Sequence, residues 1–256
     1  MKINELIKTQ YQRTPISQQE IDDLDKVDLD SPERGAYAVG FPTDDPHIFR
    51  KQTVKPTDTT VDPTFLYIKT VEPFINSNPY FPKTYIVDLR YDTHGHIRPA
   101  YHMEALVHGS DYAKRAKTPT QGEGYSGDSI HTMAKRMFGT ENWLKAAPLT
   151  MLIDKTPLIR NPEFLWSKLT KLTKELFLEF PNMETVETYK LKLDPKLIQC
   201  FQIISKLMHK YPQFEDDLHE NNFMIRRTQL GPQLVISDPL STRSTSDDTD
   251  YEYDDI

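Results

Sequence analysis

The sequence predicts an α+β fold in which a β-rich first half is followed by a mainly helical second half. Up to about residue 107, apolar and polar residues alternate in the two-residue period of strands. Farther along, apolar residues recur every three or four positions, as they do on one face of a helix. With 256 residues, 37% of them hydrophobic, the chain can bury a core without disulfides or metal ions.

Four strands and one helix are expected in the first half. Residues 35–53 contain two alternating runs around a proline-rich turn, which predicts a hairpin. Residues 63–75 follow an aspartate, begin with proline and carry apolar side chains at helical spacing, so we expect a short helix that ends at Pro73. The β-rich runs 84–92 and 96–108, joined by a glycine-containing turn, predict a second hairpin.

Three helices are expected in the second half. Residues 109–127 are polar and glycine-rich, which favours a loop. Helices are predicted over 130–139, 162–180 and 195–212, the second from a stripe of leucines and the third from an apolar face between two prolines. These apolar faces are typical of a core, and we assign no chemistry to them.

The charge and cysteine content limit the possible classes of protein. A net charge of −7 argues against direct nucleic-acid binding, and no apolar run is long enough to span a membrane. Because Cys200 is the only cysteine, no intramolecular disulfide can form, and a cytoplasmic location is expected. Residues 17–34 form an acidic helix or linker in this interpretation, and 241–256 form a disordered acidic tail.

Polar residues at the ends of a last predicted hairpin form the candidate site. Strand-like runs at 223–227 and 233–237 flank a turn, so their outer ends should meet. Asn222 precedes the first run and Asp238 follows the second, while Asp217 lies on the adjoining loop. A carboxylate and an amide oxygen are hard ligands suited to Mg²⁺, and a second aspartate could accept a hydroxyl proton.

These residues resemble a protein-kinase catalytic loop followed by the strand that leads to the metal-binding aspartate. The segment Asp217-Leu218-His219-Glu220-Asn221-Asn222 and the later Asp238-Pro239 are similar to the short serine/threonine protein kinases of podophages. The resemblance is strong over about 214–241 and weak over 31–107, and motifs do not trace it over 109–190.

The resemblance implies a two-lobed protein-kinase-like fold and a Mg²⁺- and ATP-dependent transfer to Ser or Thr of host or phage proteins. The implied parts are an antiparallel β-sheet N-lobe (1–107), a reduced helical C-lobe (108–240) and the tail, which could dock on a host protein. Asp217 would be the catalytic base, and His219 would stand where many kinases place a lysine near the γ-phosphate. Asn222 and Asp238 would bind the metal.

The same resemblance assigns nucleotide-binding positions to the first half. Gly35, Ala36 and Tyr37 would belong to the phosphate-covering loop. The next strand would carry the phosphate-contacting cation, either Lys51, which we prefer, or Arg50, because a shift of one residue exchanges the faces of a strand.

Two further parts of the nucleotide site are implied in the first half. Glu72, on the short helix, would pair with the cation, unless it is a surface glutamate before a proline. Glu104 and Leu106 would lie in the hinge that binds adenine through backbone groups.

Departures from the kinase pattern leave two other functions open. The arginine that precedes the catalytic aspartate, most glycines of the phosphate loop and the activation segment are missing. The same losses would be expected of a pseudokinase that acts as an interaction protein. A small-molecule phosphotransferase of the aminoglycoside-kinase kind would also lack the activation segment.

Overall fold

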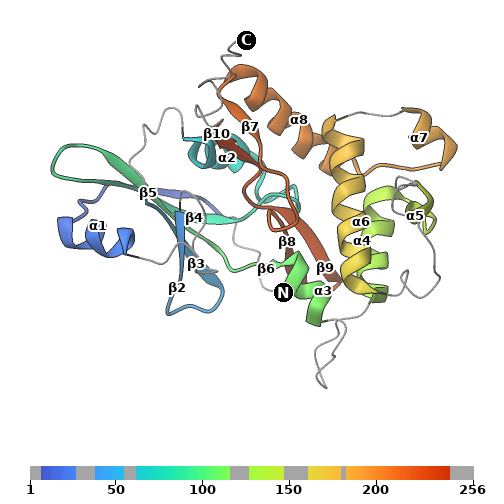
Figure 1. Cartoon of the computed structure of the whole chain (residues 1–256), viewed down its shortest axis with the longest axis horizontal. Coiled ribbons are helices and arrows are strands. Elements are labelled where there is room, and N and C mark those ends of the chain that lie inside the picture. The colour runs from blue at the N-terminus through green and yellow to red at the C-terminus, as the bar shows by residue number, and fades with distance from the viewer. Residues whose placement is uncertain are drawn as a thin grey trace, which may run out of the picture.

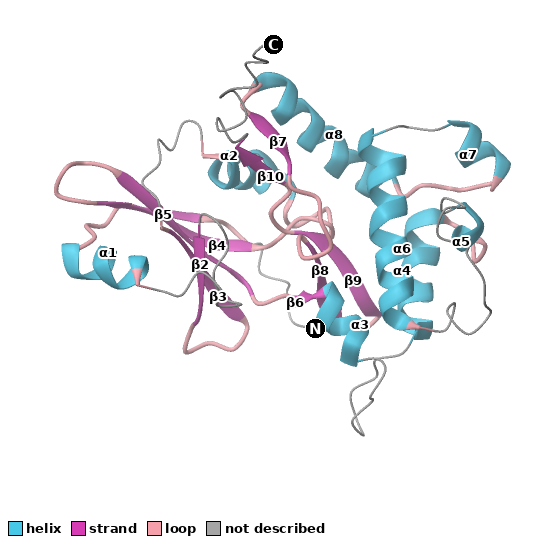
Figure 2. Cartoon of the chain, in the orientation of Figure 1, coloured by secondary structure: helices cyan, strands magenta, loops and turns pink. Residues whose placement is uncertain are grey.

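The computed structural model of the chain has a mixed α+β architecture (Figures 1 and 2). It describes residues 7–26, 38–54, 62–115, 127–146, 161–179 and 183–242. A five-stranded sheet lies on the left in Figure 1, and most of the helices lie on the right, with the C-terminal strands between them. Among the described residues, no helix has both the length and the apolar character needed to cross a bilayer.

The five-stranded sheet has the order β1-β4-β5-β3-β2. Its antiparallel centre confirms the two hairpins expected in the first half, whereas β1, which pairs in parallel with β4, was not expected. The strands are β1 (Gln10–Gln12), β2 (Ala38–Pro42), β3 (Ile48–Thr53), β4 (Thr84–Tyr91) and β5 (Ile97–Glu104).

One helix covers each face of this sheet. Helix α1 (Gln18–Asp25) begins with a capping box between Ser17 and Glu20 and packs apolar residues on Val39. Helix α2 (Pro63–Val71) packs on Tyr101. Val39 is aligned across the sheet with Ala100, and Tyr101, the next residue, points to the other face. Helix α2 therefore covers the face opposite α1. The helix predicted over 63–75 is thus confirmed, with its last residues in the 3-10 turn η1 (Glu72–Phe74).

The second half contains the helices that were predicted and several that were not. Residues 109–115 are helical, so the loop predicted over 109–127 is wrong in its first part, and residues 116–126 lie outside the described residues. Gly109 can begin this helix because its missing side chain leaves room for the buried ring of Trp166. The helices are α3 (Gly109–Arg115), α4 (Gly127–Phe138), α5 (Trp143–Ala146), α6 (Pro162–Lys174) with the π-helical η4 (Glu175–Glu179), α7 (Met183–Thr188) and α8 (Pro195–Lys210).

Two small sheets connect these helices to the candidate site. The predicted last hairpin is present as β8 (Phe223–Thr228) and β9 (Gly231–Ile236), joined by β6 (Val107–His108) at its edge. Strand β7 (Phe214–Asp216) pairs with β10 (Leu240–Thr242). The first two residues of the predicted disordered tail are therefore in a strand, and residues 243–256 lie outside the described residues.

The largest core cluster lies between these small sheets and the helices. It includes Trp166 and Leu169 of α6, Phe201 and Ile204 of α8, and Phe223 of β8. The leucine stripe assigned to a core is thus buried. Leu218 of the loop between β7 and β8 and Leu240 of β10 belong to the same cluster, so the core anchors the segments around the candidate site.

Candidate functional site

Asp217, Asn222 and Asp238 converge where the two small sheets meet. The backbone N–H of Ser237 donates to the carbonyl of Asn222 at 3.1 Å, and the N–H of Asp217 donates to the carbonyl of Pro239 at 2.9 Å. Asp238 is therefore held between residues that are bonded to Asn222 on one side and to Asp217 on the other. The Asn222 amide also donates to Oδ2 of Asp217 at 3.1 Å. The convergence expected from the hairpin is confirmed.

Lys51 reaches this cluster from the five-stranded sheet. Its Nζ donates to Oδ2 of Asp238, across 187 residues of sequence, and lies 3.4 Å from Oγ1 of Thr64. The Thr64 hydroxyl donates to the other carboxylate oxygen of Asp238 at 2.9 Å. The ion pair is partly shielded, since the two side chains are 21% and 28% exposed. A cation on β3, a hydroxyl at the start of α2 and the carboxylate after β9 thus form one polar group.

Asp62 is a further carboxylate at this place to which the sequence assigned no function. Its Oδ1 accepts the N–H of Phe65 at 2.6 Å, as the N-cap of α2, and the hydroxyl of Tyr101 at 2.9 Å. Burial raises the pKa of Asp62, and the charge of nearby Lys51 opposes that rise. The Asp-Pro start of the helix indicated only a cap. Tyr101 is buried, so its hydroxyl needs a buried acceptor, and Asp62 is that acceptor.

The environment of Asp217 suits a group that exchanges a proton. Burial, followed by a smaller effect from the charge of Asp238, raises the pKa of Asp217, whereas His219 lowers it. The side chain is still 38% exposed, so a substrate hydroxyl could reach it. A carboxylate with a raised pKa is a better proton acceptor than an ordinary aspartate.

His219 lies beside Asp217. Its Nδ1 accepts the N–H of Asn221 at 3.3 Å, and its Nε2 lies 3.1 Å from the amide nitrogen of Asn222. Nε2 lies 3.5 Å from Oδ1 of Asp217, so the ring can orient this carboxylate.

Asp238 and Asn222 have the donor atoms that a magnesium ion requires. The Oδ1 atom of Asn222 accepts no hydrogen bond from any described residue, which leaves it available as a ligand. The carboxylate of Asp238 is the second hard oxygen donor. No group of three acidic, histidine or cysteine side chains that could hold a metal occurs in the described part of the chain. The pair therefore fits Mg²⁺ shared with phosphate oxygens, but it does not form a complete protein cage.

Two of the implied positions lie away from this cluster. Arg50 faces α1 on the other side of the sheet, where its Nη2 donates to Gln52 at 2.9 Å, so Lys51 is the cation that faces Asp238. Glu72 accepts the hydroxyl of Tyr11 at 2.8 Å near the opposite end of α2. The expected pairing of Glu72 with the cation is wrong, because Thr64 at the start of the helix takes that place.

Glu104, expected in the adenine hinge, is engaged in structural contacts. Glu104 is buried and pairs with Arg226 of β8, with its Oε2 2.7 Å from the arginine Nε. The backbone N–H of Glu104 donates to the carbonyl of Lys83, so neither the side chain nor the N–H of Glu104 is available to a base. Leu106 lies partly exposed between β5 and β6. Gly35, Ala36 and Tyr37, expected in the phosphate-covering loop, lie outside the described residues.

Comparisons with known proteins find structural likeness that is weak. No protein-family model matches the chain, and no curated protein matches it. Among solved structures, an apo pseudokinase aligns over 79% of this chain and 90% of its own, with 10% identity and a TM-score of 0.29. At this score the likeness is weak, and kinase-type chemistry remains a proposal that depends on the chain's own residues.

Proposed function

We propose that this chain is a two-lobed, protein-kinase-like phosphotransferase that moves the γ-phosphoryl group of ATP to a hydroxyl group. The observation that carries the proposal is the ion pair of Lys51 with Asp238 beside Asp217 and Asn222. It combines a cation, a hard-oxygen pair and a carboxylate with a raised pKa, which are the groups that phosphoryl transfer needs. The resemblance to short podophage kinases favours Ser or Thr of proteins as the acceptor.

In this proposal each residue has a distinct task. Asp217 orients the acceptor hydroxyl and takes its proton while the hydroxyl oxygen bonds to the γ-phosphorus. The bond from that phosphorus to the β,γ-bridging oxygen breaks, and ADP leaves. Lys51 neutralises phosphate charge once it separates from Asp238. Asp238 and Asn222 would hold Mg²⁺, which supplies further neutralisation of the phosphates when bound.

Asp62 is the residue we assign to positioning Lys51. Lys51 would lose its acidic partner in the cluster if Asp238 held a metal ion. Asp62 caps the helix turn that carries Thr64, whose Oγ1 lies 3.4 Å from the Lys51 Nζ, so it would be the remaining acid beside this cation. This acid at the N-terminus of α2 would replace the glutamate expected within the helix.

A second candidate function is an interaction protein that lacks phosphoryl transfer. Both carboxylate oxygens of Asp238 already have partners, Lys51 and Thr64, so metal binding must compete with these contacts. If that competition fails, the chain would keep the fold without the chemistry. The acidic tail, which lies outside the described residues, would then be a candidate docking segment.

Transfer of label from ATP separates these two functions. The purified chain is incubated with Mg²⁺, ATP labelled at the γ-phosphate and a generic protein acceptor. We expect label on the acceptor or on the chain itself, and its loss in Asp238→Asn. Glu220→Gln is the matched control, because Glu220 is an exposed acid of the same loop and its replacement removes the same charge. Equal labelling by Asp238→Asn would contradict the assignment, and no labelling by the unmodified chain would favour the interaction protein.

A further inference from the structure

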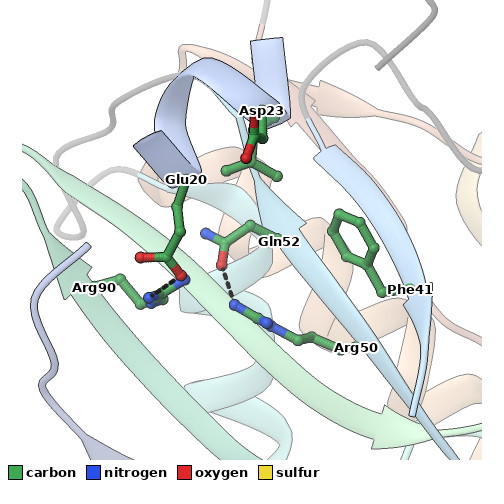
Figure 3. Close-up of a pocket in the computed structure, with 7 residues that line it drawn as sticks. Glu20, Asp23, Phe41, Arg50, Gln52 and Arg90 are labelled. Carbon is green, nitrogen blue, oxygen red and sulfur yellow. Dashed lines mark hydrogen bonds and ion pairs between the residues drawn. The ribbon is translucent and has the colours of Figure 1, made fainter. Parts of the chain in front are cut away.

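A pocket lies on the face of the five-stranded sheet that α1 covers, opposite the face that carries Lys51. Its volume is about 210 Å³. Figure 3 shows Arg50 and Arg90 reaching toward each other across the sheet, next to Glu20. The lining residues come from α1, β2, β3 and β4, and are Glu20, Asp23, Leu24, Phe41, Arg50, Gln52 and Arg90.

Gln52 positions the guanidinium group of Arg50 through a hydrogen bond. Gln52 is only 1% exposed, and its Nε2 donates to the backbone carbonyl of Arg98 at 3.0 Å. This bond turns the Gln52 Oε1 toward Arg50, whose Nη2 donates to it at 2.9 Å. The Nε of Arg50 is buried and has no partner among the described residues.

Two more arginines share this face of the sheet. Arg90 and Arg98 are directly opposite each other on β4 and β5, so their side chains lie on the same side. Arg90 donates to Glu20 at 2.9 Å, whereas the buried Nε of Arg98 has no partner in the described part of the chain.

Three acidic side chains share this face with the three arginines. Glu20 forms an ion pair with Arg90, and the exposed Asp23 forms one with Lys26. Asp88 accepts the hydroxyl of Thr14 through one oxygen, and its other oxygen is buried without a described partner. Burial, and then the charge of Arg50, lower the pKa of His102, whereas the charge of Asp88 raises it.

We propose that this pocket binds a small oxyanion, a phosphate or carboxylate group, between Arg50 and Arg90. The planar guanidinium fork matches such groups with paired hydrogen bonds, and the side chains of Arg50 and Arg90 both line the pocket. The pocket is smaller than the roughly 300–1,000 Å³ of ordinary ligand sites, so it suits a single anionic group and not a nucleotide. The proposal does not depend on phosphotransferase activity.

Calorimetric titration with inorganic phosphate, and separately with acetate, tests this inference at constant ionic strength. We expect saturable binding of one of these anions, and the two arms distinguish a tetrahedral phosphate from a carboxylate. Arg50→Gln should weaken binding about tenfold or more, the effect of losing a charge-assisted hydrogen bond. Arg50→Lys, which keeps the charge but not the fork, should weaken it as well. Lys206→Gln, an exposed charge removal on α8, is the matched control and should bind as the unmodified chain does.

The variant Lys51→Gln tests whether the anion binds in this pocket or in the candidate phosphotransfer site. This variant should retain anion binding, because Lys51 faces α2 and Asp238. Loss of binding in Lys51→Gln with retention in Arg50→Gln would place the anion in the other site and overturn the inference. Absence of saturable binding to the unmodified chain would also overturn it. If Arg50→Gln does not fold, Arg90→Gln replaces it with the same expectation.

Discussion

At the scale of single residues, the candidate site contains carboxylates whose charged forms are disfavoured. Asp217 and Asp62 both have raised pKa values, with burial as the main cause. Such groups destabilise the folded state whenever the pH lies above their ordinary values, because folding then removes a charge from water. Groups kept at a cost to stability are typical of functional sites.

The first prediction concerns Asp217→Asn at neutral pH. The pKa of Asp217 is raised on folding, so its ionised form is penalised above the ordinary carboxyl pKa of about 3.8, and the neutral asparagine removes that penalty. We expect a higher melting temperature together with a loss of labelling of about 100-fold or more. The melting temperature and the label-transfer rate are measured in parallel, with Glu220→Gln as the control. A lower melting temperature would contradict this account of the Asp217 environment.

Some of these residues could be read from the sequence and others could not. Asp217, Asn222 and Asp238 were predictable because a hairpin brings its outer ends together whatever its surroundings. The sequence could not decide between Lys51 and Arg50, because helices cover both faces of β3. The alternation of residues along this strand therefore does not show which side chain faces the site.

At the scale of elements, helix α2 decides which residues meet Lys51. The helix begins with its N-cap at Asp62 and places Thr64 at the ion pair. Glu72 is eight residues farther along, which at 1.5 Å per residue is about 12 Å down the helix axis. The sequence indicated an acidic residue on this helix, but the direction in which the helix approaches the sheet set which end is near Lys51. That direction depends on tertiary packing.

A second prediction tests the start of α2 with two substitutions of Asp62. Asp62→Ala removes the cap of Phe65 N–H and leaves the buried Tyr101 hydroxyl without its acceptor. We expect a loss of about 2 kcal/mol or more in the free energy of unfolding. Asp62→Asn keeps both hydrogen bonds and should lose much less. Urea denaturation of the two variants measures the difference, and equal losses would show that neither contact stabilises the helix.

At the scale of the whole molecule, a buried ion pair ties the five-stranded sheet to the C-terminal hairpin. Arg226 of β8 donates through Nε to Glu104 at the end of β5, and through Nη1 and Nη2 to the carbonyls of Pro79 and Phe81, each at 2.8 Å. The side chains of Arg226 and Glu104 are only 14% and 8% exposed. These partners are 122 residues apart, so no local pattern could have indicated the contact.

A third prediction is that this ion pair stabilises the contact between the end of β5 and strand β8. Arg226→Met leaves Glu104 buried without a counter-charge, and we expect a loss of about 3–5 kcal/mol in the free energy of unfolding. Adding Glu104→Met to the same chain should recover part of the loss, because no unpaired charge then remains. The exposed neighbour Arg227→Met is the control and should cost clearly less than Arg226→Met, because it leaves no buried acid without a counter-charge. Calorimetric unfolding compares the four proteins; an equal effect at both arginines would show that burial of the pair is unimportant.

The binding of ATP with and without Mg²⁺ tests most directly whether Lys51, Asp217, Asn222 and Asp238 form one nucleotide site. We predict that the unmodified chain binds ATP more tightly when Mg²⁺ is present. Asp238→Asn should abolish this dependence on the metal, whereas Glu220→Gln should keep it. The account would be contradicted if the unmodified chain bound no ATP under either condition, or if Asp238→Asn retained the full effect of Mg²⁺.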